Sequence, residues 1–385
     1  MKIWNKHFII FLIMNTAIFL SFNMSTAGFP AYVSSYGSSY LTTGLVTSVS
    51  AVAALLLRPV AGYLVDYRDG KCFLLVGLAC LASPFFCLFS SNAEMILIVR
   101  FLQGAGWGLA STVCSKTIAN TLPHERISEG IGYAGFLSSV AAAFAPSFAI
   151  SISGKMGFNL MFVFIGICPI IAIIFSIISR HNKKEDVESK GEKEHSFIVL
   201  SFEAFVPAFL IMTITMAYAP MVTFIIPYTQ TIGVSGTKEF FFAYACATTI
   251  SRPLTGFYVD RKNTYSPTVM ALLCVVVASV LLFSCRSSSL LIIAGVFAGI
   301  GTGVGMNALQ TLAVKKVTRT KRGMAMAIFL FGFDLGMAVG SLIAGIISSS
   351  IGFKQMFIIM SFPSLLACIV LVVTTIRKRK ILHIR

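Results

Sequence analysis

Apolar residues fall into long runs along this chain, separated by short polar segments. Twelve of these runs have about 20 residues or more, the length that an α-helix needs to cross the hydrocarbon core of a bilayer. They lie at about 8–29, 40–63, 72–90, 94–117, 127–152, 158–179, 200–228, 240–259, 266–285, 289–314, 323–348 and 354–376. The pattern predicts an all-α membrane protein with twelve transmembrane helices.

The polar segment 180–196 separates the first six runs from the last six. It mixes lysine and glutamate with almost no apolar residues, so it cannot bury enough surface to become ordered by itself. We therefore predict an N-terminal half at 1–179, a cytoplasmic linker at 180–196 and a C-terminal half at 197–385.

The charge pattern orients these helices. The chain carries 30 Lys and Arg against 14 Asp and Glu, and its net charge is +16. With a cytoplasmic N-terminus, 25 of the 30 basic residues fall on the cytoplasmic side, as the positive-inside rule requires. We expect a multi-pass protein of the plasma membrane with both termini cytoplasmic and lipid as its surroundings. Nucleic acid is not an expected partner, because the basic residues recur in every second loop and do not interleave with aromatic residues on one surface.

Composition narrows the classes of function. Apolar residues make up 57% of the chain and charged residues 11%, with a mean hydropathy of +0.88. No long polar stretch could fold as a separate catalytic domain. The nine cysteines and five histidines lack metal-ligand spacing, and no nucleophile motif or phosphate loop is present. We expect no enzyme activity, no cofactor and no metal.

The two halves contain an internal repeat. The second run ends in an Arg-Pro-x-x-Gly-x-x-x-Asp sequence that the eighth run repeats at an offset of 194, and glycines in the fourth run recur in the tenth at an offset of 195. The repeated positions are Arg58, Pro59, Gly62 and Asp66 with Arg252, Pro253, Gly256 and Asp260, and Gly104, Gly106 and Gly108 with Gly299, Gly301 and Gly303. Duplicated six-helix halves are typical of transporters that alternate access by moving one half against the other.

These motifs resemble those of the major facilitator superfamily. The segment from Gly62 to Lys71 is similar to the family's signature between spans two and three, although Tyr67 stands where the family usually has a basic residue and Gly70 comes one position late. Arg100, Gln103 and Gly104 resemble its fourth-span motif. The resemblance implies two pseudo-symmetric six-helix halves. It also supports a gating role, with ordinary loop caps as the alternative, for the repeated residues Arg58, Gly62, Asp66, Arg252, Gly256 and Asp260.

Spans five and eleven carry further glycine and proline signals. Gly132 and Pro146 keep the spacing of a fifth-span pattern found in the family's drug/proton antiporters, although most of its glycines are alanine here. The alternative is a generic kinked helix. Gly332, Gly336 and Gly340 place a smooth face on span eleven, which we expect to meet span two or five.

One acidic and one basic residue lie deep inside predicted spans. Burying a charge in a bilayer is costly, so such residues are usually functional. We expect Asp334 to take up and release a proton, and Arg100 to pair with Asp334 or with substrate. A fixed structural ion pair is the alternative.

Uncharged polar residues within the spans are candidates for a substrate cavity. They are Asn15, Asn23, Gln103, Tyr218, Asn307 and Gln310. Each could instead bridge two helices.

Together these features predict a secondary transporter. We expect proton-coupled export of a small amphipathic compound (a drug, metabolite or chelator) by a monomer, with the small-molecule substrate and protons as partners. A proton-linked nutrient importer is the first alternative, and a membrane sensor without transport is the second.

Overall fold

The computed structural model describes residues 4–35, 40–67, 70–89, 92–178, 202–315, 317–318 and 321–383. The predicted linker at 180–196 lies outside these residues. The described chain is almost entirely helical and forms two compact units. The all-α fold class is confirmed.

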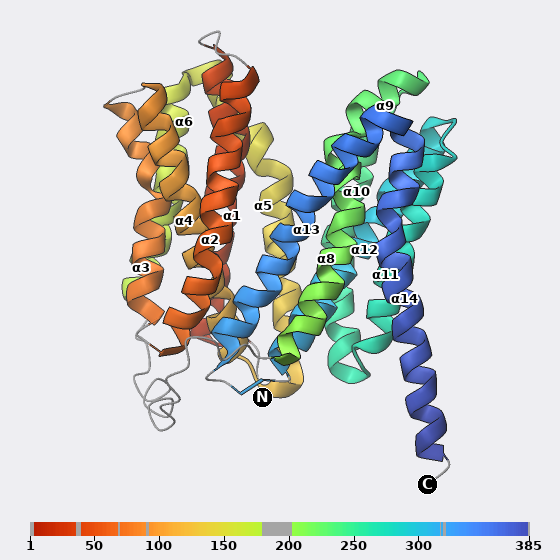
Figure 1. Ribbon diagram of the computed structural model, residues 1–385. Helices are drawn as coiled ribbons and strands as arrows, with labels where there is room; N and C mark the ends of the chain where they lie inside the picture. The colour runs from red at the N-terminus through yellow and green to blue at the C-terminus, as the bar shows by residue number, and fades with distance from the viewer. Residues whose placement is uncertain are drawn as a thin grey trace. The chain divides into compact units, whose positions relative to one another are not determined.

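Unit 1 consists of Met1–Arg126, Leu137–Glu203 and Val314–Phe331. It holds the N-terminal part of α13 (Arg322–Ile351) and the C-terminal part of α5 (Ile127–Met156). Its other helices are α1 (Lys6–Ser35), α2 (Tyr40–Tyr67), α3 (Gly70–Leu81), the short 3-10 helices η1 (Ser83–Leu88) and η2 (His124–Arg126), α4 (Ala93–Asn120) and α6 (Phe158–Ile178). In Figure 1, α2 and α3 pack on α4, and α1 packs on α6.

Unit 2 consists of Ile127–Phe136, Ala204–Ala313 and Gly332–Arg385. It holds the first part of α5 and most of α13. Its other helices are α8 (Phe202–Thr223), α9 (Ile225–Ile232), α10 (Thr237–Arg261), α11 (Tyr265–Phe283), α12 (Ser288–Lys315) and α14 (Phe353–His383). Helix α11 packs along α14.

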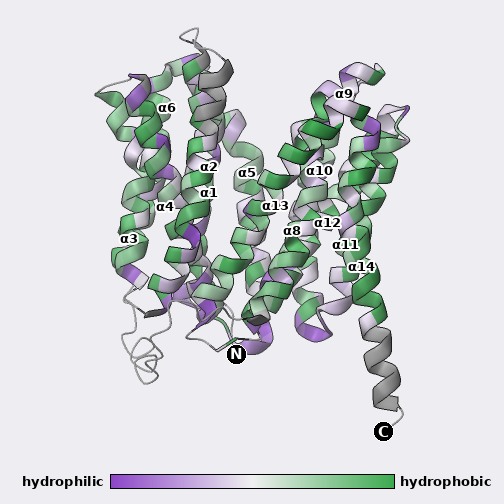
Figure 2. Ribbon diagram, in the orientation of Figure 1, coloured by the Kyte–Doolittle hydropathy of each residue, from purple (hydrophilic) through white to green (hydrophobic). Residues whose placement is uncertain are grey.

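Eleven of the described helical segments are long and apolar enough to cross a membrane. Figure 2 shows hydrophobic residues along the helices of each unit and hydrophilic residues mainly near helix ends. Many large apolar side chains, such as Phe148, Leu254 and Ile346, are exposed, as residues that face lipid must be. Helix α10 occupies the place of the predicted eighth span. It is less apolar than the other spans because it carries Arg252 together with several threonines and tyrosines.

Two predicted spans are broken where proline removes a backbone donor. The span predicted at 72–90 divides into α3 and η1, with Pro84 in the first turn of η1. The span predicted at 200–228 divides into α8 and α9 at Phe224, where Pro227 cannot donate to the carbonyl four residues earlier.

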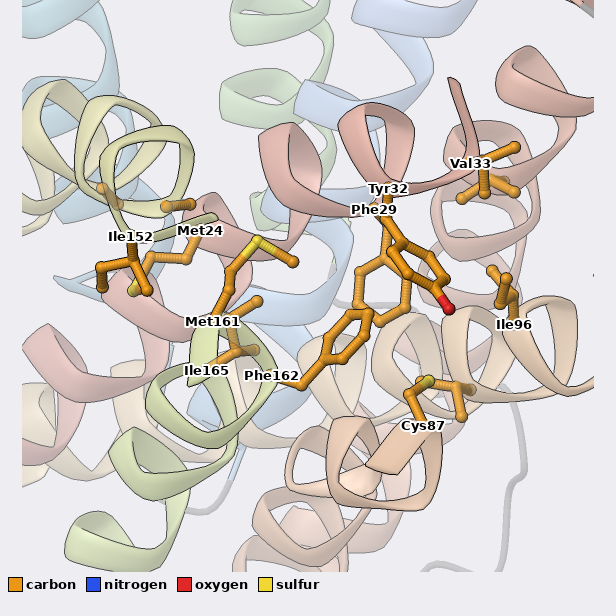
Figure 3. Packing of buried hydrophobic residues seen from close by; sticks show 14 residues of the cluster. Met24, Phe29, Tyr32, Val33, Cys87, Ile96, Ile152, Met161, Phe162 and Ile165 are labelled. Carbon is orange, nitrogen blue, oxygen red and sulfur yellow. The ribbon is translucent and has the colours of Figure 1, made fainter. Parts of the chain in front are cut away.

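The core of unit 1 is a cluster of apolar side chains from α1, α4, α5 and α6, joined by residues of α2 and η1 (Figure 3). Phe29 and Tyr32 of α1 meet Phe162 of α6 with ring centroids 5.2 and 5.0 Å apart. Met161 and Ile165 extend the same surface of α6. This packing fixes α1 against α6, and so positions the buried polar residues that lie on the same helices.

Candidate functional site

Asp66, at the end of α2, caps the N-terminus of α13 within unit 1. The backbone N–H of Gly323 donates to Oδ1 at 2.9 Å, and that of Met324 donates to Oδ2 at 2.7 Å. The first N–H groups of a helix have no acceptor in their own helix, and the helix dipole favours a negative charge there. The carboxylate therefore ties α2 to the beginning of α13.

Two cations strengthen this connection. Lys116 Nζ of α4 lies 2.8 Å from Asp66 Oδ1 and forms an ion pair with it. Arg322, the first residue of α13, donates to the Ala119 carbonyl at 2.9 Å and to Asn120 Oδ1 at 3.0 Å, at the C-terminus of α4. The beginning of α13 is thus bonded to the ends of both α2 and α4.

Asp260 caps α5 in the same way within unit 2. The N–H of Ser128 donates to Oδ1 at 3.1 Å and that of Glu129 donates to Oδ2 at 2.6 Å. Asn307 of α12 adds two hydrogen bonds to Ser128: the Ser128 hydroxyl donates to Asn307 Oδ1, and Asn307 Nδ2 donates to the Ser128 carbonyl. The beginning of α5 is therefore bonded to α10 and α12.

The two caps correspond residue for residue. Ser128 and Glu129 are the second and third residues of α5, and adding 195 to their numbers gives Gly323 and Met324, the second and third residues of α13. Gly62 and Gly256, one turn before each aspartate, let the helices approach this closely. A Cβ at Gly62 would meet the backbone at Gly323 and Met324, and one at Gly256 would meet the backbone at Ser128 and Glu129.

Lys116 and Arg322 have no basic counterpart at the repeat offset. At the offset of 195, Thr311 stands where unit 1 has Lys116, and a threonine cannot form an ion pair. Ile127 likewise stands where unit 1 has Arg322. The sequence showed both aspartates but missed Lys116 and Arg322, because neither belongs to the repeat. The repeat offset, applied to the first turn of span five, could have found the helix ends that the aspartates cap.

Arg100 lies in a buried network of neutral partners in unit 1. Its Nε donates to the Val46 carbonyl at 2.9 Å, Nη1 to Gln103 Oε1 at 3.1 Å and Nη2 to Ser50 Oγ at 2.6 Å. Its guanidinium also lies 5.4 Å from the centre of the Phe29 ring, a cation–π contact. These contacts all lie within unit 1, whereas Asp334 belongs to unit 2. The pairing of Arg100 with Asp334 stays a prediction.

Three of the predicted cavity residues are buried and bridge helices. Asn15 donates to Ser138 Oγ at 2.8 Å, Gln103 donates to Ser25 Oγ at 2.8 Å, and Asn307 bonds to Ser128 as described above. Buried amides of this kind hold helices together where lipid supplies no hydrophobic driving force between them. The contacts favour the helix-bridging alternative for these three residues.

The other three predicted cavity residues are half-buried. Asn23 Nδ2 donates to the Phe19 carbonyl of its own helix at 2.8 Å. Gln310 lies on α12, and Tyr218 on α8 stacks on Tyr244 of α10. Asp334 is half-buried on α13. These positions leave access for a ligand, and their role in binding stays a prediction.

The glycine face of span eleven packs differently from the expectation. Gly332, Gly336 and Gly340 lie against the backbone of α8 at Ala208, Met212 and Met216, so the face meets span seven, and the expected contact with span two or five is wrong. Helices next to each other in one half approach closely here. Gly132 lies close to the backbone of α10 at Arg252 and Pro253, and Pro146 lies inside the continuous helix α5.

The comparisons with known proteins agree with this architecture. The family model of the Major Facilitator Superfamily matches residues 11–289 and 270–383. An uncharacterized MFS-type transporter of Methanocaldococcus jannaschii is 24% identical over 90% of this chain and 91% of its own length. The staphylopine export protein of Staphylococcus aureus is 21% identical over 89% of this chain and 88% of its own. The quinolone resistance protein NorA of the same species is 22% identical over 60% of this chain and 58% of its own.

Solved structures share the fold. The human organic anion transporter MFSD10 superimposes with a TM-score of 0.78 at 15% identity, covering 95% of this chain and 98% of its own. The transporter FucP, in the outward conformation, gives a TM-score of 0.73 at 13% identity, covering 96% and 99%. The helices, the repeated caps and the family model together define a membrane transporter fold. The chain belongs to the Major Facilitator Superfamily.

Proposed function

We propose that this protein is a proton-coupled exporter of small amphipathic compounds that works by alternating access. The observation that carries the alternating-access part is the pair of equivalent helix caps, Asp66 on α13 and Asp260 on α5. A helix movement that exposes either N-terminus must break two charge-assisted hydrogen bonds. Such bonds favour one conformation and are lost in the other, which is what a reversible gate requires.

The relatives support export. The names of two of them, the staphylopine export protein and the quinolone resistance protein NorA, describe export of a compound or resistance to one. Asp334 supports coupling to protons, because a carboxyl group within a span can bind and release a proton as its surroundings change. We place the protein in the cell membrane as a monomer with both termini cytoplasmic.

A proton-linked importer is the second candidate, since the structural neighbour FucP is a fucose:proton symporter. Everted membrane vesicles with an acidified interior separate the two. An exporter that exchanges substrate for protons accumulates labelled substrate inside such vesicles, whereas a symporter discharges preloaded substrate together with protons. Labelled compounds are first selected by the stabilisation that they give the purified protein. Accumulation that collapses when the pH gradient is dissipated supports export, and proton-driven discharge would replace export with import.

A further inference from the structure

Arg252 of α10 differs from its repeat counterpart Arg58. Arg58 is 2% exposed and donates from Nη1 to Ser111 Oγ of α4 at 3.3 Å. At the offset of 195, the position of Ser111 is taken by Met306, whose thioether is a weak acceptor. The duplicated arginine in unit 2 therefore lacks the hydroxyl partner that the arginine of unit 1 has.

Arg252 has donors that nothing in the described part of the chain accepts. Its Nη1 donates to the Gly135 carbonyl of α5 at 2.9 Å, within unit 2. Its Nε is buried and has no hydrogen-bond acceptor among the described residues. No described carboxylate lies within ion-pair distance of it either. A half-buried cation with open donors costs free energy within a membrane protein. An anion that binds there would recover part of that free energy.

Two tyrosines lie within range of the charge of this guanidinium. Tyr218 of α8 and Tyr244 of α10 are stacked, with ring centroids 5.0 Å apart and an interplanar angle of 14°. Their phenol groups interact with each other and with the charge of Arg252. Thr302 Oγ1 of α12 donates its proton to the Ala298 carbonyl at 2.9 Å and lies 3.3 Å from the Tyr244 hydroxyl, from which it can accept. Hydroxyl protons rotate between neighbouring acceptors, so the phenols can turn their protons toward an anion.

We propose that Arg252, Tyr218 and Tyr244 form a binding site for a carboxylate group of the transported compound. The proposal rests on the proposed transport function and narrows its substrate class to amphipathic organic acids and zwitterions. From the sequence we expect a gating role for Arg252 and a cavity position for Tyr218, and no role for Tyr244. The structure brings the three side chains together from α8 and α10.

The donor geometry selects the ligand. With Nη1 on Gly135, the guanidinium still offers Nε and Nη2, which lie on one edge and match the two oxygens of a carboxylate. A phosphate with two charges would need further cations. Among the described residues, Arg252 is the one cation that interacts with these tyrosines. A single planar carboxylate is therefore the best match.

The experiment measures ligand-dependent thermal stabilisation of the purified full-length protein. The probes are three acids, each with its neutral amide: indole-3-acetate and indole-3-acetamide, benzoate and benzamide, and hexanoate and hexanamide. We expect at least one acid to stabilise the protein saturably while its amide does not. Arg252→Gln should weaken the apparent affinity for that acid by about tenfold or more, as expected for loss of a charge-assisted pair.

Further variants separate binding from folding. Tyr218→Phe and Tyr244→Phe keep the ring packing and should each weaken acid binding about threefold to tenfold. Arg252→Lys keeps the charge but not the planar edge, and should give an intermediate loss of acid affinity. It takes the place of Arg252→Gln if that variant fails to fold. Arg286→Gln, an exposed arginine in the loop after α11, removes the same charge and should bind acid like the parent.

Three results would overturn the proposal: equal stabilisation of the parent by acids and their amides, acid binding at the parental level by the Arg252 and tyrosine variants, or no stabilisation by any acid. Proton-driven flux decides the transport function separately. Flux without Arg252-dependent acid binding would refute the carboxylate site but not the transport function. Acid binding without flux would refute the transport function but not the carboxylate site.

Discussion

At the scale of single residues, buried charge is the strongest signal in this chain. Arg100 has its three kinds of nitrogen satisfied by neutral oxygens, while Arg252 has open donors and Asp334 lies half-buried within α13. A charge whose donors are satisfied by its own unit serves structure. A charge that remains partly open to a ligand or a proton can serve transport.

Asp334→Asn is expected to abolish proton-driven transport and to leave substrate binding within about twofold of the parent, because the amide keeps the shape but cannot exchange a proton. Substrate-induced proton release from the detergent-solubilised protein measures the coupling directly. Glu239→Gln, which removes an exposed carboxylate at the beginning of α10, is the matched control and should release protons like the parent. Proton release by Asp334→Asn at the parental level would eliminate Asp334 as the coupling site.

At the scale of helices, the caps and the glycine faces determine which elements stay together. Asp66 and Asp260 bond the first turns of α13 and α5, and glycines at the contacts admit the neighbouring backbone. Polar bonds at helix ends can break and re-form, whereas a close glycine contact is kept by shape. The caps can therefore change between conformations, whereas the α13–α8 contact should stay in place.

Asp66→Asn and Asp260→Asn are both expected to shift the protein away from the capped conformation without unfolding it. Loss of the charge at a helix N-terminus costs about 0.3–1 kcal/mol, which shifts a two-state equilibrium roughly twofold to fivefold. Asp66→Asn also breaks the ion pair with Lys116, which adds to its effect.

Cysteine reporters in a cysteine-free background, labelled from each side of the membrane, measure this shift. The control is Glu125→Gln, which removes an exposed carboxylate beside the N-terminus of α5, the helix end that Asp260 caps. It should leave labelling unchanged. Unchanged labelling in both aspartate variants would refute the gating role of the caps.

Gly336→Ala is expected to lower the stability by about 1–3 kcal/mol, because the added Cβ would meet Thr215 and the Met212 backbone and force α8 away. Gly154→Ala provides the control on α5. A Cβ there meets nothing within 4 Å, so this variant should be neutral or stabilised by up to about 1 kcal/mol through helix propensity. Thermal unfolding in detergent compares the two variants, and equal melting temperatures would contradict close packing of α13 on α8.

At the scale of the whole molecule, each compact unit contains a segment from the other half of the sequence. Unit 1 includes Val314–Phe331, and unit 2 includes Ile127–Phe136. Each unit is therefore completed by a helix end that its own half of the sequence does not supply. These two exchanged segments connect the two halves of the sequence within the units.

Cutting the chain within 181–195, with both halves expressed together, is expected to leave most of the transport activity. The segment is charged and has no apolar face to pack, and the exchanged segments can hold the halves together. Vesicle flux and co-purification of the two halves are the measurements. Loss of flux from halves that still co-purify would show that the segment has a role of its own.

The sequence by itself determined the class of fold. Hydrophobic runs report burial in lipid along one dimension, so they located the helices, and the repeat at 194–195 indicated the duplication. It also identified Asp66 and Asp260, because a carboxylate next to a helix end has few alternatives to capping or pairing.

Only the tertiary structure decided what each polar residue contacts. Arg100 donates to a carbonyl and a hydroxyl of α2 and to an amide of its own helix. The glycine face of α13 meets α8. The structure likewise stacked Tyr244 on Tyr218, within range of the charge of Arg252. Periodicity defines which face of a helix a residue occupies, but the neighbour of that face depends on packing among all the helices, which no local pattern encodes.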